Sequence, residues 1–146
     1  MDNKNKQKNS KMKFKFLKHT ADIKFRAYGN TLNKVFENSA LAMYNAVYPR
    51  KIKSKIKKSF IVKGKDLESL LYNFLEELLV LFDSQDFIAS KINVKIDKKE
   101  MILKCVIYGD KVGNYDIGLT IKAITYNSMY VKKSKEGYVS QVVLDV

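Results

Sequence analysis

The last third of the chain constrains the fold most, because residues 91–146 carry five short stretches with the two-residue periodicity of β-strands. Polar turn-like pieces such as DKKE and SKEG separate these stretches, as is typical of antiparallel strands. The five stretches read KINVKID, EMILKCVIYG, IGLTIKAITY, MYVKK and YVSQVVLDV. This part of the chain is therefore predicted to be purely β, so any helix must lie upstream.

Upstream, strand-like and helix-like segments alternate. Residues 13–18, 23–28 and 52–63 have strand periodicity, whereas residues 31–47 and 66–82 place apolar side chains at helical spacing. We therefore predict an α+β fold: a single domain with a mostly antiparallel β-sheet and two α-helices packed on one face. Residues 1–11 lack any periodicity and are predicted to be a disordered basic arm, followed by a folded domain over 12–146.

The formal charge of +13 is concentrated in two segments. Residues 1–18 carry +6 and residues 50–65 carry +8, so the rest of the chain is close to neutral. Such patches attract polyanions, and the candidate contact residues in the second segment are Arg50, Lys51, Lys53, Lys55, Lys57 and Lys58. The alternative is a solvated lysine-rich face, because only two of the 28 basic residues are arginine, the side chain that usually recognises phosphates and bases.

Several classes of protein fit this sequence poorly. No stretch approaches the roughly 18 to 20 apolar residues of a membrane span, and the N-terminus lacks the apolar region of a secretory signal. The single cysteine, Cys105, fits a reducing compartment, so we expect a cytoplasmic protein without membrane contact. One cysteine and one histidine cannot form an ordinary zinc site, and no nucleophile motif is present.

Oxygen ligands for a hard divalent cation remain available. Asp22 precedes a predicted strand, Asp145 lies in the last one, and Val146 adds an α-carboxylate. If the sheet brings the last strand beside the first strands, these groups would crowd together and tend to hold a cation or a proton. Solvated aspartates at strand ends are the alternative, and His19 alone would more commonly be a hydrogen-bonded structural residue.

Three stretches, in order, resemble the archease family. The first contains the family's H-T-A-D motif followed by A-Y-G-x-T-L, and it reads KHTADIKFRAYGNTLNKVFENSALAM. The second is similar to the family's second helix and reads GKDLESLLYNFLEELLVLFDSQ. The third is similar to the C-terminal part of the family and consists of IKAITYN and the final VVLDV. The resemblance implies an α+β accessory protein that is not itself an enzyme. It also implies a partner, the RtcB-type tRNA-splicing RNA ligase, whose guanylylation and multiple turnover archeases promote.

The resemblance places a divalent metal ion, Ca²⁺, Mg²⁺ or Mn²⁺, at Asp22, Asp145 and the terminal Val146. His19 and Asn127 are possible supporting residues. Asn127 departs from the family, which commonly has histidine there, and an amide can neither carry a proton nor ligate as an imidazole does.

Three functions stay open at this point. The leading one is activation of the ligase, and the second is an RNA-binding chaperone that modulates tRNA processing or methylation through the basic segments. The third, a small metal-dependent hydrolase, is the weakest because no further acid or base can be assigned beside the two aspartates.

Overall fold

The computed structural model describes residues 12–17 and 22–146. The basic arm expected over 1–11 and the candidate residue His19 lie outside the described residues. Within them, no helix is long and apolar enough to cross a membrane.

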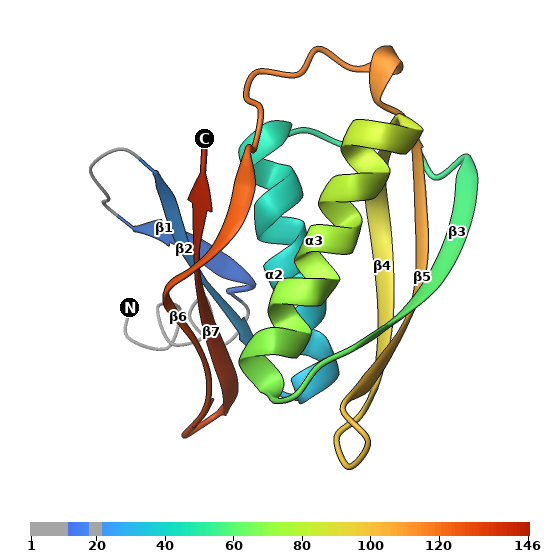
Figure 1. Ribbon diagram of the computed structural model, residues 1–146. Helices are drawn as coiled ribbons and strands as arrows, with labels where there is room; N and C mark the ends of the chain where they lie inside the picture. The colour runs from blue at the N-terminus through green and yellow to red at the C-terminus, as the bar shows by residue number, and fades with distance from the viewer. Residues whose placement is uncertain (1–11, 18–21) are drawn as a thin grey trace, which may run out of the picture.

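The strands of the described chain form two antiparallel sheets (Figure 1). The four-stranded sheet has the order β1-β2-β7-β6, and the three-stranded sheet has the order β3-β5-β4. The strands of the first sheet are β1 (Phe14–Leu17), β2 (Ile23–Gly29), β6 (Ala123–Ser134) and β7 (Gly137–Asp145). Those of the second are β3 (Ile56–Lys63), β4 (Phe87–Asp97) and β5 (Ile102–Lys111), after which a short 3₁₀ helix, η1 (Val112–Asn114), leads into the loop before β6.

Two helices, α2 (Leu32–Val47) and α3 (Leu67–Gln85), lie between the sheets (Figure 1). Helix α2 contacts β2 and β7 on one side and β4 on the other, while α3 contacts β6 and all three strands of the smaller sheet. The predicted α+β class, with two helices and mostly antiparallel strands in one domain, is confirmed. The strands divide into two sheets that cover the helices from both sides, so ten of the sixteen residues of α2 are buried.

Local sequence signals set the ends of both helices. Thr31 is the N-cap of α2, and its side chain accepts a hydrogen bond of 3.1 Å from the Lys34 N–H. Asp66 and Ser69 form a reciprocal capping box at the start of α3. Helix α3 continues past the predicted end at residue 82 and stops at Asp86, whose left-handed backbone (φ 55°) cannot extend the helix.

Side chains of α2 protect the free edge of β4. Glu37 Oε2 accepts a hydrogen bond of 2.8 Å from the Val94 N–H, and Asn33 Oδ1 accepts one of 3.0 Å from the Ile96 N–H. These side chains replace the neighbouring strand that an edge lacks, which prevents edge-to-edge pairing. They also explain why Glu37 is buried although it carries charge.

Strand β6 differs most from its prediction. The two stretches predicted as separate strands, IGLTIKAITY and MYVKK, contribute to one strand that begins only at Ala123. A bulge interrupts the pairing with β7 between Thr125 and Tyr130, and Ser128 within it has a positive φ of 56°. The bulge breaks the two-residue period, so a continuous strand looks like two.

Candidate metal site

The two candidate aspartates lie at the same end of neighbouring strands. Asp22 directly precedes β2, and Asp145 is the last residue of β7, which pairs with β2. Ile23 and Leu144 are Cα partners in this ladder, so Asp22 and Asp145 are the next residues beyond this pair, one on each strand. The structure therefore brings together two residues that are far apart in sequence, as the terminal strand lies beside β2 (Figure 1).

The last two residues are held by the fold. The Asp145 carbonyl accepts a hydrogen bond of 2.8 Å from the Lys122 N–H, and Asp145 pairs with Ala123 of β6. Val146 is partly buried and packs against the hydrophobic core. The Asp145 side chain is exposed, whereas the preceding Leu144 is fully buried, because alternate side chains of a strand point to opposite faces.

The donor atoms available here suit a hard cation. Carboxylate oxygens of Asp22 and Asp145, with main-chain oxygens at Val146, are the ligand type that Ca²⁺, Mg²⁺ and Mn²⁺ prefer. No group of three histidine, cysteine, aspartate or glutamate side chains that could hold a metal occurs in the described ranges. Any site at this position must therefore use main-chain oxygens or residues outside those ranges to complete its ligand set.

Cys105 takes no part in this arrangement. It lies in β5 of the other sheet and is almost fully buried. Burial, with a smaller effect of the Glu37 charge, raises the pKa of the Cys105 thiol to about 12. A thiol with such a pKa is neither a nucleophile nor a ready metal ligand at neutral pH.

Asn127, the other supporting candidate, lies in the bulge of β6 and is exposed. The partner of Asp145 on that strand is Ala123, so the ladder places Asn127 farther along the sheet from the two aspartates. Its neighbour Tyr126 stacks on Tyr72 of α3, with ring centroids 4.2 Å apart and an interplanar angle of 6°. The structure does not bring Asn127 beside Asp145 through strand pairing.

The basic segment lies on the three-stranded sheet and the loop before it. Most of its candidate side chains are exposed: Arg50, Lys51, Lys53, Lys55 and Lys57. Lys58 is half-buried instead, because alternation along β3 places it on the other face from Lys57. Its Nζ donates a hydrogen bond of 2.9 Å to Gln85 Oε1 at the end of α3, so this lysine has a structural contact.

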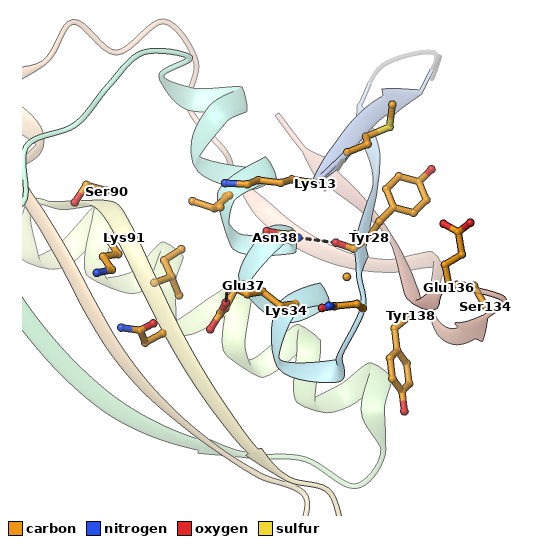
Figure 2. Close-up of a pocket in the computed structure, with 16 residues that line it drawn as sticks. Lys13, Tyr28, Lys34, Glu37, Asn38, Ser90, Lys91, Ser134, Glu136 and Tyr138 are labelled. Atoms are coloured by element: carbon orange, nitrogen blue, oxygen red, sulfur yellow. Dashed lines mark hydrogen bonds and ion pairs between the residues drawn. The ribbon is translucent and has the colours of Figure 1, made fainter. Parts of the chain in front are cut away.

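A cavity of about 510 Å³ opens above α2, between β2 and β4 (Figure 2). Some of its polar side chains form contacts within the fold: Asn38 Nδ2 donates a hydrogen bond of 2.6 Å to the Tyr28 carbonyl, and Glu37 pairs with Lys34 at 3.1 Å. None of the predicted site residues that the structure describes lines this cavity. The contacts around it join α2 to both sheets.

A second cavity, of about 480 Å³, lies by the four-stranded sheet. Arg26 lines it, and its Nε donates a hydrogen bond of 2.9 Å to Gln141 Oε1 on β7. Gln141 Nε2 in turn donates one of 2.8 Å to the Ser128 carbonyl in the bulge. This cluster of Arg26, Gln141 and Ser128 was not predicted from the sequence. The one sequence signal for it is that Arg26 is one of only two arginines.

Comparison with known proteins gives a consistent result. The family model described as "Archease protein family (MTH1598/TM1083)" matches residues 14–146. A "Protein archease" from Methanosarcina acetivorans is 39% identical over 140 residues, covering 92% of this chain and 96% of the relative. Another from Pyrococcus furiosus is 41% identical over 134 residues, covering 88% and 94% respectively.

Solved structures are similar as well. The solution structure of Methanobacterium thermoautotrophicum protein 1598 has a TM-score of 0.81 at 32% identity, covering 92% of this chain and 99% of that one. The crystal structure of a Thermotoga maritima archease, described as a possible chaperone, has a TM-score of 0.64 at 19% identity, covering 90% and 96%. The second likeness concerns the fold alone.

Proposed function

This chain belongs to the archease family, and on that premise we propose that it activates an RtcB-type tRNA-splicing RNA ligase. In this proposal it promotes guanylylation of the ligase and allows multiple turnover, without being a catalyst itself. It acts in the cytoplasm, through a divalent ion (Ca²⁺, Mg²⁺ or Mn²⁺) held by Asp22, Asp145 and the main-chain carboxylate of Val146.

The observation that carries the proposal is the register of β2 and β7. It puts Asp22 and Asp145 next to each other at one end of the sheet, where two negative charges favour a bound cation. When bound, such an ion supplies positive charge that offsets phosphate charge during guanylyl transfer.

The surrounding fold supports a working surface at this end. The Lys122–Asp145 hydrogen bond and the packing of Val146 hold the end of β7 in place, while the Asp145 carboxylate stays exposed. A partner that binds a carboxylate on a strand already held in place loses less chain entropy than one that must first order a free end. His19 precedes Asp22 closely enough in sequence to serve as a further ligand or as an orienting group.

The test is to add the protein in catalytic amounts to the ligase with GTP, a divalent ion and RNA ends. The proposal predicts faster guanylylation of the ligase and repeated rounds of joining. It is wrong if the protein binds RNA but leaves the guanylylation rate unchanged at every divalent ion tested.

An RNA-binding chaperone of tRNA processing or methylation is the second candidate. It is favoured by the exposed cations of residues 50–57, which precede and begin β3. It predicts RNA binding and refolding activity in the absence of any ligase. Ligase stimulation that survives neutralisation of this basic segment would count against it.

A further inference from the structure

We infer that the outer face of the four-stranded sheet binds a single strand of RNA, with Arg26 as its phosphate anchor and Tyr130 as a stacking platform. The surface differs from the metal site and from the basic segment of residues 50–58. The choice of RNA as the ligand rests on the proposed function, whereas the surface itself follows from strand register and side-chain contacts.

The ladder aligns four polar side chains in one row across the whole sheet. Lys15 of β1 pairs with Arg26 of β2, Arg26 pairs with Gln141 of β7, and Gln141 pairs with Tyr130 of β6. Cα partners in adjacent strands project to the same face. With strands about 4.8 Å apart, this row extends over roughly 14 Å.

A second row lies beside the first on the same face. Tyr28 of β2 pairs with Val139 of β7, and Val139 pairs with Lys132 of β6. Helix α2 packs on the other face of the sheet, and Figure 2 shows the Tyr28 ring on the side of β2 away from α2. Three cations and two tyrosine rings therefore lie on a sheet face that no helix of the described chain covers.

Arg26 is positioned before any ligand arrives. Its Nε bonds to Gln141, and Gln141 is only 5% exposed and held by the Ser128 carbonyl. A guanidinium has five N–H donors, so this contact leaves four for a ligand. A planar guanidinium fixed in this way presents a fork that matches the oxygens of a phosphate.

The cavity at this position has the size of a small-ligand pocket and a positively charged lining. Its volume of about 480 Å³ falls within the usual range for small-ligand pockets. Lys15, Arg26 and Lys135 line it against a single acidic side chain, Glu136, so the net charge of its lining is positive. The rings of Tyr28 and Tyr130 line the same cavity.

Tyrosine rings distinguish this face from a simple basic patch. Lys132 Nζ lies 4.3 Å from the centroid of the Tyr130 ring, so a positive charge lies directly beside the ring on which a base would stack. Bases stack on aromatic side chains without regard to sequence, and a basic groove follows the backbone. Unpaired bases are required for such stacking, so the ligand must be single-stranded.

The experiment measures binding of a fluorescent 12-nucleotide oligouridine to the full chain, without ligase, across a range of KCl concentrations. A 12-base-pair RNA duplex is the comparison ligand. The expected preference is for the single strand, and Tyr130→Leu should weaken its binding about fivefold or more, while leaving duplex binding unchanged. Arg26→Met and Lys15→Gln should each lower the log–log salt slope by about 0.7.

Arg26→Lys separates charge from position. The variant keeps the charge but loses the Nε contact with Gln141, so affinity should fall severalfold at an unchanged salt slope. Matched controls on the three-stranded sheet are Lys104→Gln and Tyr108→Leu, which should have no comparable effect. Thermal unfolding of each variant checks that the fold is intact.

The inference is wrong if Tyr130→Leu and Arg26→Met bind the single strand as the native protein does, or lose no more affinity than the control variants. It is also wrong if these variants keep RNA binding but lose contact with the ligase, since the face would then dock a protein. If the native protein does not stimulate guanylylation of the ligase, the proposed function is refuted but the RNA result stands, so the two failures are distinguishable.

Discussion

Asp22 and Asp145 flank the paired residues Ile23 and Leu144, so two carboxylates from opposite ends of the chain stand at one end of the β2–β7 ladder. Neither residue has a sequence neighbourhood that demands a metal. The juxtaposition arises from the antiparallel pairing of an N-terminal strand with the C-terminal strand, and it supplies a reason for a cation at this position.

Asp22→Asn should weaken binding of divalent ions while the fold stays intact, because the substitution keeps the shape but removes one charge. The variant should still fold cooperatively in chelator, and added Ca²⁺, Mg²⁺ or Mn²⁺ should raise its melting temperature less than that of the native protein. Calorimetric titration with each ion measures the change directly. Asp116→Asn, at an exposed loop position, is the matched control. Native metal affinity in Asp22→Asn would remove this residue from the site.

Neutralising the basic segment tests whether it contacts RNA. Lys51, Lys53, Lys55 and Lys57 are exposed, and their joint replacement by Gln should lower the slope of log affinity against log salt by roughly 0.7 to 0.9 for each lost phosphate contact. Lys58→Gln is a separate variant, because Lys58 bonds to Gln85 and its loss should affect stability more than binding. An unchanged slope would assign the four lysines to a solvated face.

The interface between α2 and the four-stranded sheet includes a fully buried hydrogen bond. Ser39 Oγ and Ser140 Oγ are 2.7 Å apart, and Ser39 Oγ also bonds to the Val35 carbonyl. Ser39→Ala should destabilise the protein by about 1 to 3 kcal/mol, because the Ser140 hydroxyl is left buried without this partner. The double variant with Ser140→Ala should lose less than the sum of the single losses. Additive losses in urea unfolding would show that the pair is not coupled.

Asp110 should give the protein an acid-sensitive contribution to stability. Hydrogen bonds from Tyr115 Oη and the Lys111 N–H, each of 2.8 Å, lower the pKa of this carboxyl below its ordinary value of 3.8. A lowered folded-state pKa stabilises the fold above the unfolded value, and this contribution is lost as the pH falls through the folded value. Asp110→Asn should therefore be less stable than the native protein near pH 6, with the difference shrinking below about pH 4. A difference that does not vary with pH in denaturant unfolding would contradict this.

Local sequence signals predicted most elements. The periodicity of residues 31–47 and 66–82 predicted both helices, since Thr31 and Asp66 supply local caps. Strand β3 is shorter than predicted and begins at Ile56, although residues 52–55 continue the alternation. Alternation indicates which residues could pair, but β3 begins where its pairing with β5 begins, at Ile56 and Gly109.

Long-range pairing could not be predicted in the same way. The division of the strands into two sheets depends on which strands meet across the helices, and no local pattern records that choice. The contact between Arg26 and Gln141 is of this kind, because it joins β2 to β7 across most of the chain. For the aspartates, the family resemblance indicated Asp22 and Asp145 before their strands were known to be neighbours.

The role of the carboxylates is tested most directly by the rate of ligase guanylylation with three forms of this protein: native, Asp145→Asn, and native with a short Gly-Ser tail after Val146. Asp145→Asn should give neither divalent-ion stabilisation nor stimulation. The extended form should fold with an unchanged melting temperature in chelator, bind the ion more weakly and stimulate little, because an amide replaces the α-carboxylate. Stimulation by Asp145→Asn at the native rate would contradict the central claim that the carboxylates at this end of the sheet are the working site.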